Sequence, residues 1–327
     1  MVRSWFGGKS RGQSTLRLYY ASDIHGSDVC WRKFLNAAKF YEVGALIMGG
    51  DLVGKALAPV VSSDDGWTIP LGGQERRAKT EQEVQEMETL LRQSGFYPLR
   101  ITRTEFDQVS SDAGLLEHKF EETIVASVRG WMELADERLS GSSVVAYVMP
   151  GNDDPSAIDE ALTGREHVVA CDDRVVRVGD HELLSLGWSN RTPWNTAREL
   201  DEDDLYKRIR ALVGQLERTE RAIFNLHVPP FDSGLDTATE LDESLRPVLI
   251  SGQPHEIPVG STAVRQVIEE VQPALALHGH IHESRGITNI GRTVCINPGS
   301  KYSSGRIDGV VVELDDQGVR HKRLVTG

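Results

Sequence analysis

The chain of 327 residues contains only three cysteines and no long hydrophobic run. Cys30, Cys171 and Cys295 lie far apart and form no CxxC pair, so we expect neither a disulfide framework nor a zinc site built from thiolates. A reducing, cytoplasmic compartment fits this cysteine content. No run of about 18 apolar residues occurs, and residues 1–14 lack the apolar stretch of a secretory signal. We therefore expect neither export nor a membrane span.

Positive charge is also scarce. Lys and Arg number 36 against 49 Asp and Glu, which gives a net charge of -13. Such a surface repels phosphate backbones and anionic lipid unless basic groups gather locally, which argues against nucleic-acid and membrane partners. With 39% hydrophobic and 26% charged residues, the composition is typical of a globular protein and not of a disordered chain. The oligomeric state is left open.

Short apolar runs that suit buried strands recur along the chain. Helical patterns alternate with several of them, which favours an α/β sandwich. We expect a flexible tail over residues 1–14 and one domain over residues 15–327. The predicted strands cover 16–21, 45–48, 144–149, 175–178, 183–186, 222–226, 274–277, 294–296 and 310–314, and the predicted helices 27–41, 155–162, 202–216 and 262–271.

The segment between the second and third predicted strands has a different character. Val84, Met87 and Leu91 repeat at helical spacing, and a longer apolar stripe runs from Leu116 to Ala135. These patterns predict two amphipathic helices. We therefore expect a helical cap insertion at about residues 55–140, placed beside the functional crevice and able to shape substrate choice.

Residues of the kind that bind metals follow almost every predicted strand. Because the carboxyl ends of strands in an open α/β sheet meet in one crevice, segments remote in sequence can converge there. Carboxylates and imidazoles together suit divalent ions such as Mn, Fe or Zn, and one carboxylate can bridge two of them. The candidate metal ligands are Asp23, His25, Asp51, Asn152, His227, His280 and His282.

Each of these motifs has an alternative interpretation when taken alone. Asp23 could cap the helix that follows it, Gly50-Asp51 is an ordinary turn dipeptide, and His227 could be a loop histidine. The segment from His278 to His282 is more specific, because packing gives no reason for three alternate histidines at a strand end. The order and strand-end placement of all the motifs together favour one metal site.

In this order the motifs resemble those of the calcineurin-like metallophosphoesterases. The family pattern DxH, GD, GN, H and GHxH is matched by Asp23 and His25, Gly50-Asp51, Gly151-Asn152, His227, and Gly279 to His282. The segment from Asn297 to Ser300 also resembles the NPGS signature of smaller bacterial and archaeal members. Within the family, the chain looks most similar to predicted phosphoesterases related to the cyclic-AMP phosphodiesterases.

The resemblance implies a four-layer αββα sandwich with two divalent ions, Mn being favoured over Fe or Zn. One ion would be held by Asp23, His25 and His282, and the other by Asn152, His227 and His280. Asp51 would bridge the two ions, and a hydroxide bridging them would attack the phosphorus in line.

The chain departs from the family pattern after Asn152. Many members have a histidine there that is thought to protonate the leaving group or to stabilise the attacked phosphate, whereas this chain has Asp153. Asp153 could instead cap the following helix or accept hydrogen bonds, so we name both Asp153 and His278 as candidate catalytic residues. Asn190 and Arg191, in a loop with two tryptophans, are candidate substrate contacts, and an ordinary structured loop is the alternative.

The sequence therefore predicts a dinuclear metal-dependent phosphoesterase that hydrolyses a small nucleotide-like or other phosphoester. We expect it to be a phosphodiesterase. One alternative is a binding protein that keeps the fold and has little or no catalytic activity. A second alternative is a phosphomonoesterase or a nuclease.

Overall fold

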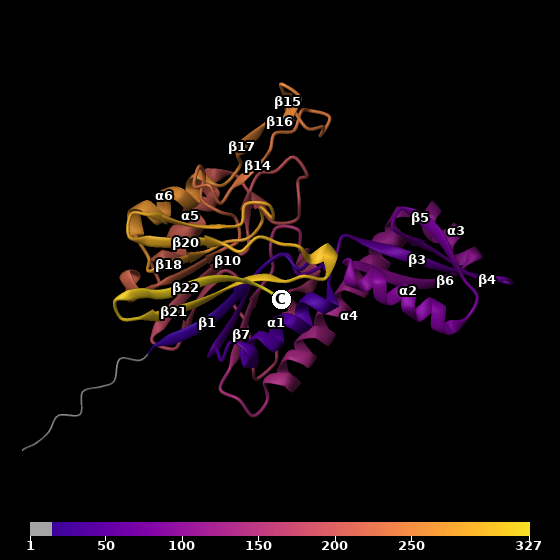
Figure 1. Cartoon of the computed structure of the whole chain (residues 1–327), viewed down its shortest axis with the longest axis horizontal. Coiled ribbons are helices and arrows are strands. Elements are labelled where there is room, and N and C mark those ends of the chain that lie inside the picture. Colours follow the sequence, from indigo (N-terminus) through magenta and orange to yellow (C-terminus); the bar gives the residue numbers. More distant parts are fainter. Residues whose placement is uncertain (1–14) are drawn as a thin grey trace, which may run out of the picture.

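The chain forms two six-stranded sheets that pack face to face, with helices on both outer sides (Figure 1). A computed structural model describes residues 15–327. The tail predicted for residues 1–14 lies outside the described residues. Among residues 15–327, no helix has the combined length and apolar character that crossing a lipid bilayer requires.

The first sheet carries the N-terminal metal-ligand motifs. Strands β1, β2, β7 and β8 pair in parallel, and β21 and β22 complete the edge beside β1 in antiparallel orientation. In the order in which they lie in the sheet, its strands are β22 (Gly318–Thr326), β21 (Asp308–Asp315), β1 (Leu16–Ala21), β2 (Ala45–Gly49), β7 (Val145–Met149) and β8 (Val168–Ala170).

The second sheet carries the C-terminal motifs. Its four inner strands are parallel, and its two edge strands are antiparallel to their neighbours. In sheet order its strands are β19 (Gly286–Ile290), β20 (Thr293–Asn297), β18 (Leu275–Leu277), β13 (Ile223–Leu226), β10 (His181–Leu186) and β9 (Arg174–Val178).

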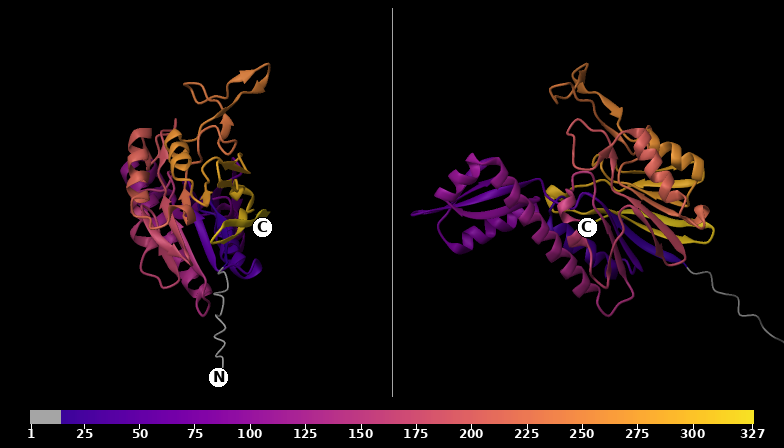
Figure 2. Two further views of the ribbon diagram at one scale, coloured as in Figure 1. Left: turned by 90° about the vertical axis from the view of Figure 1, so that its left-hand side faces the viewer. Right: turned by 180° about the vertical axis from the view of Figure 1, so that it is seen from behind.

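Four helices and three apolar cores complete the sandwich. Helices α1 (Asp28–Phe40) and α4 (Ala113–Leu139) cover the first sheet, where the ring planes of Trp31 and Trp131 stack at 5.4 Å. A second core lies between the sheets, and a third lies under α5 (Glu202–Val213) and α6 (Thr262–Val271). Figure 2 shows the layers from the side. This arrangement confirms the predicted four-layer αββα sandwich.

Most predicted elements lie within a few residues of their observed bounds. The hydroxyl of Ser27 caps α1 by accepting a hydrogen bond from the Cys30 amide, and Ser261 caps α6 in the same way. The helix predicted over residues 155–162 is wrong, since the segment forms two short 3₁₀ turns, Ser156–Ile158 and Glu160–Leu162. Neither turn has a side-chain cap, and the segment instead places Ile158 and Leu162 in the core.

The insertion is a mixed α/β unit and not the helical cap that we expected (Figure 1). Both predicted helices are present, as α2 (Glu81–Gln93) and α4, but a four-stranded sheet packs with α2 around a small core of its own. Each of these strands has only one or two buried residues, as in QERRA of β5, so none reads as a buried strand of the kind found in the main sheets. The unit consists of β3 (Ala56–Ser63), β4 (Gly66–Leu71), β5 (Gln74–Ala78), β6 (Phe96–Thr102), α2 and α3 (Arg103–Ser111).

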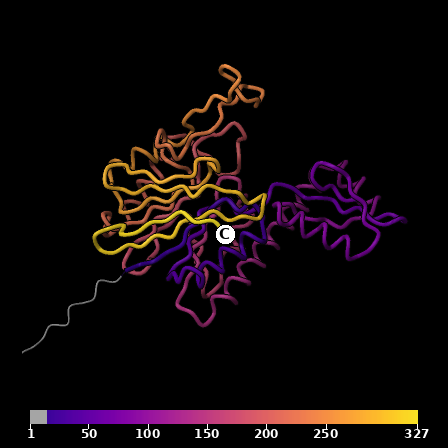
Figure 3. The backbone as a smooth tube through the Cα atoms, viewed as in Figure 1, coloured from indigo at the N-terminus to yellow at the C-terminus, as the bar shows by residue number. Residues whose placement is uncertain are grey.

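A second projection leaves the sandwich at the top of the view in Figure 1. It is an arm made of two successive two-stranded antiparallel sheets, and the backbone trace shows it clearly (Figure 3). The arm contains β14 (Thr237–Thr239), β15 (Leu249–Ile250), β16 (Gln253–Pro254) and β17 (Glu256–Pro258). The remaining short elements are β11 (Ser189–Asn190), β12 (Glu199–Leu200) and the 3₁₀ turns Thr219–Arg221 and Tyr302–Ser304.

Candidate metal centre

The seven predicted ligands follow strand ends from both sheets and lie together in one cluster. They follow β1, β2 and β7 of the first sheet and β13 and β18 of the second. Five of them are no more than 2% exposed, and the other two, His280 and His282, are partly buried. The structure thus brings together residues separated by up to 259 positions, Asp23 to His282.

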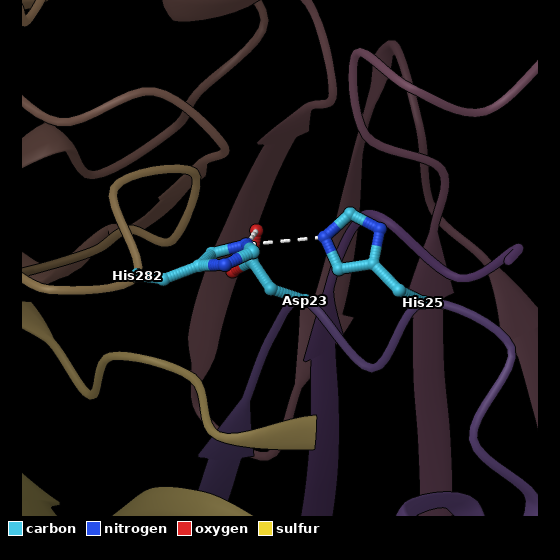
Figure 4. Close-up of side chains that lie close together, drawn as sticks. All are labelled: Asp23, His25 and His282. Carbon is cyan, nitrogen blue, oxygen red and sulfur yellow. Dashed lines mark hydrogen bonds and ion pairs between the residues drawn. The ribbon is translucent and has the colours of Figure 1, made fainter. Parts of the chain in front are cut away.

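The first half-site consists of Asp23, His25 and His282 (Figure 4). The Nε2 atoms of His25 and His282 lie 3.1 Å apart, and Nε2 of His282 lies 3.4 Å from Oδ1 of Asp23. All three ligand atoms fall within 4.8 Å of one another. Two imidazole nitrogens and a carboxylate oxygen at this spacing could hold one divalent ion.

The second half-site consists of Asn152, His227 and His280. Nε2 of His227 lies 3.0 Å from Oδ1 of Asn152, and the imidazole rings of His227 and His280 meet edge to face at 5.4 Å. The two histidines and Asp51 form another group whose ligand atoms lie within 4.8 Å of one another. This group too could hold a divalent ion.

Asp51 lies between the two half-sites. Its Oδ2 is 3.6 Å from Nε2 of His25, and its Oδ1 is 3.4 Å from Nε2 of His227. One carboxylate oxygen therefore faces each half-site, which is the arrangement that a bridging ligand needs.

The backbone at the ligands is held in an unusual conformation. Asp23, His25, Asp51 and His280 all have positive φ, between 37° and 66°. Each such residue costs on the order of 1–3 kcal/mol and persists only where its surroundings fix it. Here the Asp23 amide donates to the Gly50 carbonyl at 2.9 Å, and the His25 amide donates to the Asp51 carbonyl at 3.0 Å. The loops thus hold each other in place.

Two of the motif glycines are required by close approach. A Cβ on Gly151 would lie 2.3 Å from Oδ1 of Asp51, and a Cβ on Gly279 would lie 2.2 Å from Oγ of Ser22. No side chain fits at either position without moving the ligand loops. Glycine therefore precedes Asn152 and His280 so that the backbone can pack against the loops of the first sheet.

The electrostatics of the cluster fit a cation. Burial opposes charge on Asp51, but the neighbouring histidines outweigh it and hold the pKa of this carboxyl well below its usual range. Burial likewise opposes charge on His227, but Asp51 and Asp23 outweigh it and raise its pKa to about 10. Burial lowers the pKa of both His25 and His280 to about 4. The two buried carboxylates thus draw a positive charge onto His227, a charge that a bound divalent ion would supply instead, while the imidazoles of His25 and His280 are neutral.

Asp153 lies at the edge of the first half-site. Its amide donates to Oδ1 of Asp51 at 3.0 Å, and its Oδ2 lies 3.8 Å from Nδ1 of His25. Burial and the charge of Asp51 raise the pKa of Asp153 to about 6. No capping hydrogen bond joins Asp153 to the following turns among residues 15–327, and its side chain instead contacts the metal cluster and Lys55.

His278 occupies a position that does not suit proton transfer to a substrate. The residue is fully buried, and its Nδ1 lies 2.9 Å from the Leu226 carbonyl and 3.1 Å from the Val228 carbonyl. Burial lowers the pKa of its imidazole to about 4. The imidazole of His278 thus contacts the two carbonyls that flank His227.

The candidate substrate residues contact other parts of the protein. Arg191 is exposed and pairs with Asp201 at 2.9 Å, whereas Asn190 donates to the Val259 carbonyl at 3.4 Å. Among residues 15–327, neither side chain forms a hydrogen bond or ion pair with a residue of the metal cluster. The same loop reaches the cluster through Thr196, whose Oγ1 accepts a hydrogen bond from the side-chain amide of Asn152 at 2.8 Å.

Sequence reasoning missed several residues that support the ligands. The buried carboxylate of Asp154 accepts hydrogen bonds from the amides of Leu52, Val53 and Gly151, at 2.7 to 2.9 Å. It therefore ties the loop after β2 to the loop after β7. Arg198 donates to the Asp154 carbonyl at 2.7 Å. The neighbouring Asp153-Asp154 pair gave no sign of which carboxylate is structural, and nothing in the local sequence marks Thr196 or Arg198.

Comparison with known proteins places the fold. No protein-family model matches the chain. An uncharacterised protein of Methanocaldococcus jannaschii is 30% identical over 156 residues, which are 47% of this chain and 63% of that protein. The matched part thus spans less than two thirds of this relative.

Similar solved structures cover nearly the whole chain. One, 16% identical, covers 95% of this chain and 99% of its own with a TM-score of 0.55, and TT1561 of Thermus thermophilus, 13% identical, covers 96% and 99% with a TM-score of 0.50. An archaeal phosphodiesterase, 11% identical, covers 95% and 100% with a TM-score of 0.34, which is too low to bear on function. The first two likenesses show that the chain shares its overall fold with these structures.

Proposed function

We propose that the protein is a dinuclear metal-dependent phosphoesterase that hydrolyses small phosphoesters. The observation that carries this proposal is the position of Asp51, which directs one carboxylate oxygen toward each of two half-sites. In this assignment Asp23, His25 and His282 hold one ion, and Asn152, His227 and His280 hold the other. Mn is the favoured ion, since imidazole, carboxylate and amide ligands without thiolate suit it.

A pair of divalent ions supplies activation of water and neutralisation of the charge on the attacked phosphoryl group. Other residues of the chain fix the orientation of the ligand side chains. The Gly49 carbonyl lies 2.8 Å from Nδ1 of His227 and so directs Nε2 of that ring toward the cluster. Thr196 holds the amide nitrogen of Asn152, which leaves the amide oxygen facing His227. The Oδ2 atom of Asp153 faces Nδ1 of His25, the ring nitrogen that does not point toward His282.

The charge of the chain bears on the substrate. A net charge of -13 disfavours long polyanions, whereas cations bound in the crevice attract a single phosphate group locally. A small nucleotide-like phosphoester is therefore the proposed substrate, either a diester or a phosphomonoester. The three cysteines are buried and free, which fits the proposed cytoplasmic location. A binding protein without activity would not need all seven ligand positions filled.

The test compares wild-type protein with Asp51→Asn after reconstitution with Mn. Turnover of bis-p-nitrophenyl phosphate and p-nitrophenyl phosphate is followed by absorbance. Loss of the shared carboxylate removes several kcal/mol of electrostatic stabilisation, so we expect both rates to fall by at least about 100-fold. Asp64→Asn, an exposed change in the β3–β4 turn, is the matched control and leaves the rates unchanged. Absence of Mn-dependent turnover in the wild type, or equal turnover by Asp51→Asn, would contradict the proposal.

A further inference from the structure

Lys55 lies at the junction between the metal centre and the insertion. It follows the central ligand Asp51 by four residues and directly precedes β3. Its ammonium nitrogen is 3.7 Å from Oδ2 of Asp153, and the same carboxylate oxygen is 3.8 Å from Nδ1 of His25. The chain thus places a cation beside the outer edge of the first half-site.

Tyr302 forms the neighbouring wall. Its ring centroid lies 4.7 Å from that of His25 and 5.9 Å from that of His282. Burial is the main cause of the raised pKa of Tyr302, and the charge of Lys55 is the next, acting in the opposite direction. Tyr302 and Asp153 thus flank the same histidine, and Lys55 lies beside Asp153.

The cation of Lys55 is free to exchange partners. Its side chain is 60% exposed, and an exposed ion pair with Asp153 is weak. Among residues 15–327, no other lysine or arginine forms an ion pair with Asp23, Asp51 or Asp153. Arg198, an arginine of the adjoining loop, is buried and committed to Asp159 and Asp172.

We infer that Lys55 binds a non-bridging oxygen of the substrate and so favours phosphoesters that carry a second negative charge on or beside the scissile phosphate. The inference rests on the proposed function, because it assigns the charge preference of that same site. Asp153 holds the ammonium group near the site before the substrate arrives, and a phosphate oxygen then offers it a stronger charge-assisted hydrogen bond. Without Lys55, the carboxylate of Asp153 would face an anionic substrate uncompensated.

The first measurement is binding of inorganic phosphate to the Mn-loaded protein by calorimetry. It is made well above the second pKa of inorganic phosphate, so that the ligand is doubly charged. We expect Lys55→Gln to weaken binding about tenfold and Lys55→Arg to restore most of it, because an ammonium-to-phosphate contact is charge-assisted. Lys79→Gln, an exposed lysine of the same insertion, is the matched control and binds phosphate as the wild type does. Equal binding by wild type and Lys55→Gln would overturn the inference.

The second measurement separates this inference from the proposed function. For Lys55→Gln we expect KM for the doubly charged p-nitrophenyl phosphate to rise about tenfold and KM for the singly charged bis-p-nitrophenyl phosphate to rise less, with kcat nearly unchanged. An equal change for both esters would overturn the inference while leaving the phosphoesterase intact. If the wild type turns over neither ester, the proposed function fails, and the phosphate titration still decides the role of Lys55.

Discussion

The two half-sites contain similar ligands but differ in how the protein supports them. In the second half-site, Nδ1 of His227 is fixed by the Gly49 carbonyl, and the amide of Asn152 is fixed by Thr196. In the first half-site, Nδ1 of His25 is buried and has no hydrogen-bond partner among residues 15–327, and the side chain of His282 is 29% exposed. Hydrogen bonds with residues outside the ligand set therefore orient the ligands of the second half-site. The first half-site lacks such a bond at His25 and is open toward Asp153, Lys55 and the insertion.

This difference predicts unequal metal affinity. Outer hydrogen bonds fix the tautomer and the orientation of a ligating imidazole, and their loss costs about 10–100-fold in affinity or activity. We therefore expect the second half-site to bind its ion more tightly and the first half-site to exchange its ion more readily. An open half-site beside a free cation is also the side from which a phosphate can enter.

The largest effect is expected from removing one imidazole in each half-site. His282→Ala should lower the bound metal from two ions to about one per chain, because the second half-site keeps all of its ligands. His227→Ala should lower it further, since His227 is fully buried and lies within 4.0 Å of both Asp23 and Asp51. Elemental analysis after dialysis measures the bound metal.

The exposed His321→Ala on β22 is the control for these two variants and should keep both ions. Two ions per chain in His282→Ala would show that the ligand assignment is wrong. Equal loss in His282→Ala and His227→Ala would remove the proposed difference between the half-sites.

A smaller effect is expected where the insertion contacts the first half-site. Gly95 has a φ of +82°, and a Cβ there would lie 2.1 Å from the His25 carbonyl oxygen. Gly95→Ala should therefore combine backbone strain with a clash, and should weaken metal binding at the first half-site. Gly72→Ala is matched, because its φ is +61° and nothing lies within 4 Å of its Cβ.

We expect Gly95→Ala to lower the free energy of unfolding by about 2 kcal/mol more than Gly72→Ala does, since overpacking adds to the shared strain. Urea denaturation of both variants measures this difference. If the two variants lose equal stability and retain equal metal, the insertion does not support the first half-site.

The metal cluster could be predicted from the sequence because its residues directly follow buried parallel strands. The carboxyl ends of such strands meet in one crevice, so residues placed there lie close together. The strands themselves could be predicted from the apolar runs around Tyr20, Ile47 and Leu277. The sheet of the insertion was not predictable from apolar periodicity, since its strands bury few residues. Its turns at Asp64-Asp65-Gly66 and Gly72-Gly73 are hairpin signals that could have revealed it.

The roles of single polar residues depend on long-range contacts and could not be predicted. Asp154 binds amides 101 and 102 positions away in the loop after β2, and Thr196 binds Asn152 across 44 positions. Neither contact follows from local spacing. The same limit applies to Lys55, whose position beside Asp153 exists only because the loops after β2 and β7 are adjacent.

The smallest effect is expected from Thr196→Val, which removes the hydroxyl that holds the Asn152 amide at 2.8 Å. The amide nitrogen of Asn152 would then keep only its hydrogen bond to Oδ1 of Asp153 at 3.1 Å, so its oxygen could turn from the second half-site. We expect metal affinity there to fall about tenfold, the lower end for an outer hydrogen bond. Thr192→Val is the matched control, because Thr192 and Thr196 both donate to Glu199 but only Thr196 holds Asn152. Competition with a metal chelator measures the tighter of the two affinities. Equal affinity in the two variants would mean that Glu199 and the loop, and not the Asn152 contact, give the second half-site its support.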